Sequence, residues 1–154
     1  MTTHRAYIGL GANLGDRIAT YERAVAALHE LGTVVRRSAI YRTQPWGRSD
    51  QPWFVNGVVL LETELEPRAL LDSLRAIETR LGRTKGERWG PRVIDLDLLL
   101  YDDREIDEPG LQLPHPYLRE RAFVLVPLVE LEESFAALRD ALDASELAGV
   151  VRLT

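Results

Sequence analysis

The sequence predicts an α+β domain of the ferredoxin-like class, in which an antiparallel sheet carries two helices on one face and further helical elements follow towards the C-terminus. The first supporting observation is the order of the periodic segments, which run strand, helix, strand, strand, helix and strand. The second is the length of 154 residues, which is typical of one domain with one core. The third is that the sequence contains no internal repeat and no linker rich in Pro, Gly or Ser. We therefore expect a single domain over residues 1–154.

The first two elements are a strand and a helix. Residues 6–10 are apolar and run into glycines, which indicates a strand that ends in a turn. Asp16 is placed to cap a helix over 17–31, in which apolar residues recur at helical spacing. Gly32 supplies the stop at the end of this helix.

Two strands and a second helix come next. We interpret residues 34–43 and 54–63 as strands, with the turn-rich stretch 44–52 between them. Pro67 then begins a helix with one apolar face, because proline is favoured in the first helical turn. Gly82 ends this helix.

A last strand and a tail complete the order. Residues 93–101 have a strong strand pattern, and a turn over 102–110 follows. The prolines on either side of His115 interrupt the chain, and a more helical tail begins at about Phe123.

Composition and charge narrow the class of protein. Hydrophobic residues make up 45% and charged residues 28% of the chain, which is an ordinary globular mixture. The chain has no cysteine, which excludes disulfides, thiolate zinc sites and cysteine nucleophiles and makes a reducing cytoplasm the expected location. No signal-peptide pattern and no apolar run of membrane-spanning length is present, so we expect no membrane association. The net charge of −5 argues against nucleic acid as a partner and leaves small-molecule substrates.

The strongest chemical signal is a pair of acidic residues in the last strand. Side chains alternate along a strand, so Asp95 and Asp97 project from one face, roughly 6–7 Å apart at the backbone. At an effective dielectric constant near 20, two full charges at that distance repel by about 2–3 kcal/mol. A cation would offset this cost, and hard oxygen ligands favour Mg²⁺, either one ion or a bridged pair suited to phosphoryl transfer. The solvated outer face of an edge strand is the alternative interpretation.

A basic segment precedes that strand directly. Residues 83–92 carry Arg83, Lys85, Arg88 and Arg92 against one acidic residue, in an otherwise acidic protein. Arginine binds phosphate oxygens in a bidentate manner, and Trp89 could cover a flat ring. This segment predicts a small anionic ligand, although a solvated loop with an incidental tryptophan is the alternative.

Weaker signals lie elsewhere. His115, held between prolines and followed by arginines, fits phosphate binding, but a structural hydrogen-bonding role is the commoner one for a single histidine. The turn from Gly9 to Asp16 is similar to a phosphate-binding turn but is not a Walker motif, and a plain turn with a helix cap explains it as well. Asn56 offers a donor and an acceptor that suit the amide edge of a heterocycle, and Phe54 shares its strand face.

Several of these stretches occur together in one known family. They are Gly11-Ala12-Asn13-Leu14-Gly15-Asp16, Tyr41-Arg42-Thr43, Asn56, Gly82-Arg83, Arg88-Trp89-Gly90-Pro91-Arg92-Val93-Ile94-Asp95-Leu96-Asp97, and Pro114-His115-Pro116 with Arg121 and Phe123. The long string that ends in the two aspartates is highly specific. From Tyr7 to about Leu131 the chain resembles the 6-hydroxymethyl-7,8-dihydropterin pyrophosphokinase family.

The resemblance implies a nucleotide site and a metal site. ATP would be a co-substrate, and two Mg²⁺ ions would be held by Asp95 and Asp97. These two aspartates, with Arg83 and Arg92 on the triphosphate, would form the catalytic set. The residues around ATP would be Glu78, Arg83, Lys85, Trp89, Arg92, Leu98, His115 and Arg121.

The resemblance also implies a pterin site. The ring would stack between Phe54 and Phe123 and be recognised by Asn56 and by the backbone and hydroxyl of Thr43. The full set of pterin-binding residues would be Thr43, Gln44, Trp46, Phe54, Asn56 and Phe123. The loops 44–53 and 82–92 would close as lids over both substrates.

The implied reaction transfers pyrophosphate from ATP to 6-hydroxymethyl-7,8-dihydropterin and releases AMP, a step of folate biosynthesis. Two alternatives stay open. Another two-metal nucleotidyltransferase would also use two aspartates on a strand but would release free pyrophosphate. A non-catalytic ferredoxin-like binding module would consume no ATP.

Overall fold

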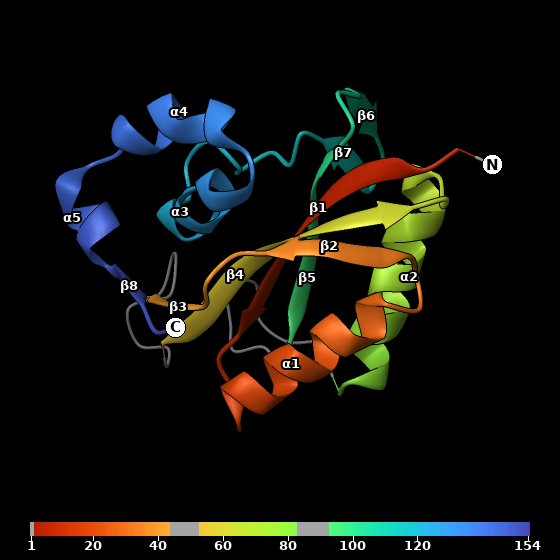
Figure 1. Ribbon diagram of the computed structural model, residues 1–154, viewed down its shortest axis with the longest axis horizontal. Helices are drawn as coiled ribbons and strands as arrows, with labels where there is room; N and C mark the ends of the chain where they lie inside the picture. The colour runs from red at the N-terminus through yellow and green to blue at the C-terminus, as the bar shows by residue number, and fades with distance from the viewer. Residues whose placement is uncertain (1, 44–52, 83–92) are drawn as a thin grey trace.

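The computed structural model describes residues 2–43, 53–82 and 93–154. Within those residues a six-stranded sheet lies between two helical layers (Figure 1). The strands of this sheet are β1 His4–Ala12, β2 Thr33–Arg37, β3 Tyr41–Thr43, β4 Phe54–Thr63, β5 Asp95–Tyr101 and β8 Val150–Arg152. A separate hairpin consists of β6 Ile106–Glu108 and β7 Leu111–Leu113. The helices are α1 Arg17–Leu28, α2 Pro67–Arg80, α3 Ala122–Leu131, α4 Ala136–Asp140 and α5 Ala144–Ala148, with a 3-10 turn over Glu133–Phe135.

The strand order is β5-β1-β4-β3-β8, and β2 lies beside β4. Every pairing in this sheet is antiparallel. The predicted antiparallel sheet with helices is therefore confirmed. Because β1 and β4 are central, residues on these two strands and on the neighbouring edge strand β5 can meet on one surface.

The two faces of the sheet are covered differently. Helices α1 and α2 lie on one face, as predicted, and the C-terminal helices lie on the other (Figure 1). Side chains alternate along a strand, so neighbouring residues of β1 enter different cores. Ile8 packs in the cluster beneath α1 and α2, whereas Tyr7 packs with Leu125 of α3. The described part of the chain contains no helix long and apolar enough to cross a membrane.

The predicted helix signals are present. The Asp16 side chain accepts a 3.1 Å hydrogen bond from the Ala19 backbone N–H and caps α1. Helix α1 ends at Leu28, three residues before the predicted end at 31, because the following amides bond three residues back in tight turns. Pro67 begins α2, and Gly82 follows it with a φ of +104°, which favours glycine.

The predicted single strand over 34–43 is wrong, because the chain breaks at Ser38. The Ser38 N–H donates to the Val58 carbonyl at 2.8 Å, and the Ser38 hydroxyl accepts from the Val58 N–H at 2.9 Å. The Val58 N–H is thus bound by a side-chain oxygen, whereas in a continuous strand a backbone carbonyl would accept this hydrogen bond. The two strands β2 and β3 result. Strand β8 and the hairpin strand β6, within the predicted turn 102–110, were also not predicted.

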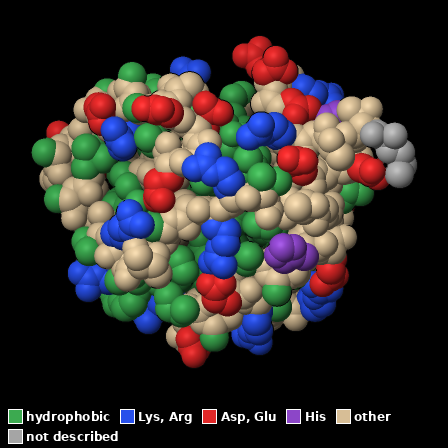
Figure 2. All heavy atoms as spheres, in the orientation of Figure 1, with side chains coloured by type: hydrophobic (Ala, Val, Ile, Leu, Met, Phe, Trp, Pro, Cys, Tyr) green, Lys and Arg blue, Asp and Glu red, His purple; other side chains and the backbone are tan. Residues whose placement is uncertain are grey.

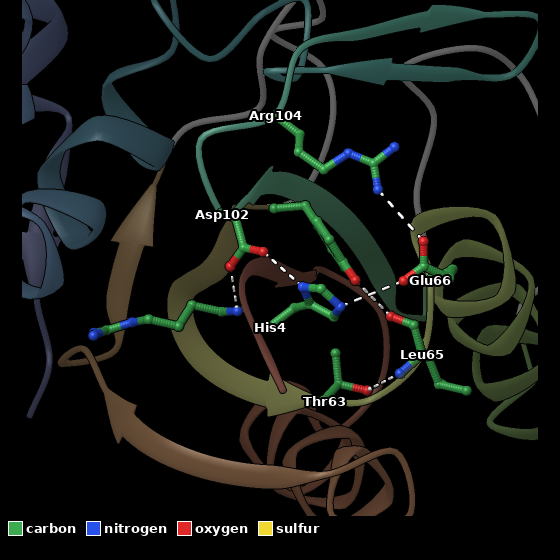
Figure 3. Close-up of polar contacts among 8 residues, drawn as sticks. His4, Thr63, Leu65, Glu66, Asp102 and Arg104 are labelled. Carbon is green, nitrogen blue, oxygen red and sulfur yellow. Dashed lines mark hydrogen bonds and ion pairs between the residues drawn. The ribbon is translucent and has the colours of Figure 1, made fainter. Parts of the chain in front are cut away.

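A polar cluster fastens the start of β1. The His4 ring lies between two carboxylates, with Nδ1 2.7 Å from Oδ2 of Asp102 and Nε2 3.4 Å from Oε2 of Glu66 (Figure 3). The Arg5 N–H donates to the other oxygen of Asp102 at 2.8 Å, and Nη1 of Arg104 lies 3.5 Å from Oε1, the other oxygen of Glu66 (Figure 3). These contacts join β1, the turn after β5 and the start of α2.

Candidate active site

Two rows of residues cross the central strands on the face that α3 covers. In the first row, Asn56 of β4 lies opposite Gly11 of β1, and Gly11 lies opposite Asp95 of β5. In the second row, Val58 and Asp97 lie on either side of Gly9. Directly opposed residues in an antiparallel ladder project from the same face, and Val58 belongs to the core beneath α3. Both aspartates therefore share a surface with Asn56.

The acidic pair is electrostatically unfavourable on its own. Burial raises the pKa of Asp97 to about 7, and the neighbouring Asp95 charge adds to this effect. The charges of Arg121 and Arg75 act in the opposite direction. A divalent cation would remove the repulsion, and two carboxylates are ligands that Mg²⁺ prefers. Among the described residues no group of three or more His, Cys, Asp or Glu side chains could hold a metal.

Arg121 supplies positive charge beside this pair. Its side chain is buried at the start of α3, where burial lowers its pKa and the carboxylates of Asp97 and Asp95 counteract that effect. The guanidinium lies 4.7 Å from the ring centre of Tyr117 and 5.3 Å from that of Phe123. Stacking on these rings holds the cation in place.

His115 lies close to Arg121 and is held by the backbone. The backbone N–H of His115 donates to the Leu99 carbonyl at 2.9 Å, and the ring Nδ1 accepts from the backbone N–H of Tyr117 at 3.2 Å. Burial, followed by the charges of Arg121 and Arg75, lowers the pKa of His115 to about 4. The ring is therefore neutral near pH 7. With Nδ1 as acceptor, Nε2–H is left as a donor.

A cavity of about 210 Å³ lies along the outer edge of β5, between α2 and the segment 110–116. It is lined by Leu71, Arg75, Leu98, Gly110, Leu111, Gln112, His115 and Pro116. Apolar walls with a few polar groups are typical of small-molecule sites. Leu98 and His115, both expected near ATP, thus meet in one cavity.

Glu78 lies behind this cavity rather than in it. Its buried carboxylate accepts from the Leu96 N–H at 2.7 Å and lies 2.9 Å from Arg75. The same Arg75 nitrogen donates to the Leu96 carbonyl at 2.7 Å. Arg75 was not predicted as a site residue. Its position three residues before Glu78 on a helix was the signal that could have identified the pair.

The residues expected to bind the heterocycle lie at the Asn56 end of the row that runs from Asn56 through Gly11 to Asp95. The hydroxyl of Thr43, on β3, donates a short hydrogen bond to Oδ1 of Asn56, and both side chains are buried. Phe54 is half-buried opposite Thr43, and Phe123 packs at the edge of the core beneath α3.

Six expected site residues lie outside the described part of the chain. They are Gln44, Trp46, Arg83, Lys85, Trp89 and Arg92. The two expected lid segments lie almost entirely outside it as well.

Comparison with known proteins identifies the family. Residues 7–133 match the 7,8-dihydro-6-hydroxymethylpterin-pyrophosphokinase (HPPK) family. The 2-amino-4-hydroxy-6-hydroxymethyldihydropteridine pyrophosphokinase of Methylorubrum extorquens is 46% identical over 155 aligned residues, which cover 97% of this chain and 98% of that protein. The Bacillus subtilis protein of the same name is 48% identical over 128 residues, covering 82% of this chain and 77% of its own.

A solved structure agrees with the fold. The crystal structure of a Plasmodium falciparum HPPK-DHPS triple mutant aligns with a TM-score of 0.72 and 15% identity. The alignment covers 90% of this chain but only 43% of that longer chain, so the likeness concerns the fold of one part of it. The family match over residues 7–133 and the identity to relatives of similar length agree, and the chain belongs to the HPPK family.

Proposed function

We propose that the protein transfers the pyrophosphoryl group of ATP to 6-hydroxymethyl-7,8-dihydropterin, releasing AMP, as a step of folate biosynthesis. The observation that carries this proposal is the row from Asn56 through Gly11 to Asp95. Adjacent strands bring opposed Cα atoms to about 4.5–5.5 Å, so the amide and the acidic pair lie about 10 Å apart at the backbone. That span suits a bicyclic ring at one end and a transferred phosphoryl group at the other.

ATP would bind along the edge of β5. The cavity beside Leu98 fits the adenine, and the neutral His115 can donate from Nε2 to the ribose or a phosphate oxygen. Arg121 would neutralise phosphate charge from the start of α3. Arg83, Lys85, Trp89 and Arg92 are assigned to ATP on the family motif. Glu78, placed near ATP by the family resemblance, would act through its hydrogen bond to the β5 backbone.

Asp95 and Asp97 would hold two Mg²⁺ ions. The repulsion within the pair, which raises the pKa of Asp97, supports a cation there. When bound, the ions would neutralise the triphosphate and make the attacked phosphorus more electrophilic. The oxygens of the triphosphate would be further ligands of the ions.

The pterin would bind at the Asn56 end of the row. Phe54 and Phe123 would stack on the ring, and the Asn56 carboxamide and the Thr43 backbone and hydroxyl would recognise its polar edge. Gln44 and Trp46 would complete the site from the neighbouring segment. Recognition by a buried amide would discriminate strongly against rings that lack the matching donor and acceptor.

In this arrangement catalysis consists mainly of positioning and charge neutralisation. The hydroxymethyl oxygen of the pterin would attack the β-phosphorus of ATP. A new O–P bond forms as the bond from the β-phosphorus to the bridging α–β oxygen breaks, AMP leaves with that oxygen, and the hydroxyl proton passes to water. The protein would hold the two reactants in line, with Arg83 and Arg92 on the transferred group.

The fold and partners fit the same proposal. The order β5-β1-β4-β2 with all-antiparallel pairing supports the ferredoxin-like class. Basic and acidic side chains are interspersed over the face in view (Figure 2), which supports small-molecule partners and gives no support to nucleic-acid binding.

Product analysis tests the proposal. The protein is incubated with ATP, Mg²⁺ and 6-hydroxymethyl-7,8-dihydropterin, and the nucleotide and pterin products are identified. We expect AMP and a diphosphorylated pterin in equal amounts. Free pyrophosphate would instead indicate a nucleotidyltransferase, and the absence of pterin-dependent ATP consumption would indicate a binding module.

A further inference from the structure

We propose that Gly11 is a positioning residue of the pterin site, whose missing side chain lets the Asn56 carboxamide lie across β1 towards Asp95. The inference rests on the proposed function and deepens it. In this role Gly11 sets the position of the bound pterin ring relative to Asp95 and Asp97.

The first argument is steric. A Cβ atom added to Gly11 would lie 2.7 Å from Nδ2 and 3.9 Å from Cγ of Asn56, and 3.7 Å from Cδ1 of Phe54. Non-bonded carbon and nitrogen atoms do not approach to 2.7 Å without strong repulsion, so the amide would have to move. For a Cβ at Gly9, two residues earlier, the three nearest atoms would be those of the Leu99 side chain, at 3.4–3.6 Å, which is ordinary van der Waals contact. Of the two glycines of β1, Gly9 and Gly11, it is Gly11 whose Cβ would clash.

The backbone gives no other reason for a glycine here. The described glycines with positive φ are Gly15, Gly82 and Gly110. Gly11 pairs regularly with both neighbouring strands, in a conformation that any residue adopts. Glycine weakens a strand by roughly 0.5–1 kcal/mol relative to alanine. Glycine at position 11 therefore costs strand stability, and the room that it leaves for the Asn56 amide is a reason for its presence.

The second argument concerns how the amide is held. Thr43 donates its hydroxyl hydrogen to Oδ1 of Asn56, and Nδ2 lies 3.4 Å from the Leu10 carbonyl. A carboxamide has two donor hydrogens and an acceptor oxygen with two lone pairs. Within the described residues these contacts use one donor hydrogen and one lone pair, so one donor hydrogen and one lone pair of the amide remain for a ligand. The Gly11 backbone is the surface beneath them, so the amide plane, its flip and its height are all fixed.

The third argument is the position of Gly11 between the two substrates. It is the residue directly opposite both Asn56 and Asp95. An amide lifted by a methyl group would carry the ring away from the acidic pair. Displacements of about 1 Å in a near-attack geometry can cost about 100-fold in rate, so this register matters for the reaction.

A double-mutant cycle that measures pterin affinity tests the role of Gly11. Wild type, Gly11→Ala, Asn56→Ala and the double variant are titrated with 6-hydroxymethylpterin in the presence of Mg²⁺ and a non-hydrolysable ATP analogue. We expect Gly11→Ala to raise the Kd for the pterin at least tenfold and to change the Kd for the nucleotide less than twofold. Because the effect passes through the amide, the double variant should bind no more weakly than Asn56→Ala alone.

Thermal stability provides the matched control. Gly9→Ala adds the same methyl group to β1 at ordinary contact distance, so it should keep the wild-type pterin affinity and melt at or slightly above the wild-type temperature. Gly11→Ala displaces a buried amide, so it should melt lower than Gly9→Ala but remain folded. Wild-type pterin affinity in Gly11→Ala, or fully additive losses in the double variant, would overturn the inference. Failure of the wild type to bind pterin would overturn it together with the proposed function. Pterin binding without AMP formation would overturn the proposed activity alone.

Discussion

The backbone N–H of Leu96 donates a 2.7 Å hydrogen bond to Oε2 of Glu78. Leu96 stands between Asp95 and Asp97, so this contact fastens the backbone of the acidic pair to α2. Arg75 closes the arrangement by binding both the Glu78 carboxylate and the Leu96 carbonyl. The acidic pair is therefore positioned by the core of the protein.

Replacing Glu78 tests that dependence. Glu78→Ala leaves the Leu96 N–H without its acceptor and Arg75 without its ion pair, and we expect the free energy of unfolding to fall by about 2–3 kcal/mol. Turnover should fall with it, because the strand that carries both aspartates loses its support. Glu78→Gln keeps an acceptor oxygen, so its stability and its turnover should both fall less than those of Glu78→Ala. Chemical denaturation measures the stability and steady-state kinetics measure the turnover. If Glu78→Ala had the stability and turnover of the wild type, the positioning role would be refuted.

Neutralising either aspartate separates function from stability. Asp95→Asn and Asp97→Asn remove a metal ligand, and we expect each to lower kcat by at least about 100-fold. The melting temperature should stay constant or rise, because the repulsion of about 2 kcal/mol is relieved. Asp103→Asn, an exposed change just beyond β5, is the matched control and should leave both quantities unchanged. Normal turnover in either active-site variant would rule out the metal assignment.

Removing the hydroxyl of Thr43 should loosen the Asn56 amide. Thr43→Val is close in shape but leaves Oδ1 of Asn56 without its donor, so the amide can rotate away from its ligand-binding orientation. Loss of one buried hydrogen bond costs about 1–2 kcal/mol, and we expect the Kd for pterin to rise about 5- to 30-fold. Thr43→Ser keeps the hydroxyl and should bind nearly normally. Equal pterin affinities of the Val and Ser variants would contradict this role.

The cluster at the start of β1 gives a pH-dependent prediction. Although burial opposes it, hydrogen bonds from the Arg5 N–H and His4 lower the pKa of Asp102 in the folded protein. Since the folded pKa is below the unfolded value, the contribution of this carboxylate is present above about pH 4 and lost as the pH falls through the folded pKa. Asp102→Asn isolates the charge, because asparagine tolerates the φ of +49° at this position.

The measurement is the difference in unfolding free energy between wild type and Asp102→Asn as a function of pH. We expect this difference to be less than about 1 kcal/mol at pH 5, because His4 and Asp102 are partly exposed. It should decrease towards zero below about pH 3. A difference that grew in acid would contradict the assigned direction of the pKa shift.

The sequence predicted the features that depend on local chemistry. Asp16 caps its helix through an interaction three residues away, and Pro67 and Gly82 act through their own backbone preferences. Strict alternation was enough to place Asp95 and Asp97 on one face. The family motif then suggested roles for residues that periodicity alone leaves open, and these roles stay predictions.

Features that depend on contacts distant in sequence were not predictable in the same way. Ser38 interrupts a strand because its hydroxyl reaches Val58, twenty residues away. Strand β8 exists only because β3 offers it an edge, and its own sequence is short and half exposed. The importance of Gly11 depends on the register that places it between Asn56 and Asp95, which no local pattern reveals.

The central claim is that Asp95 and Asp97 hold divalent ions against a triphosphate. A crystal structure of the protein with Mg²⁺, a non-hydrolysable ATP analogue and 6-hydroxymethylpterin tests it most directly. The account predicts two ions at about 2.0–2.1 Å from these carboxylates, bridging to phosphate oxygens, with the pterin on Asn56. Carboxylates without ions, and a nucleotide bound elsewhere, would contradict it.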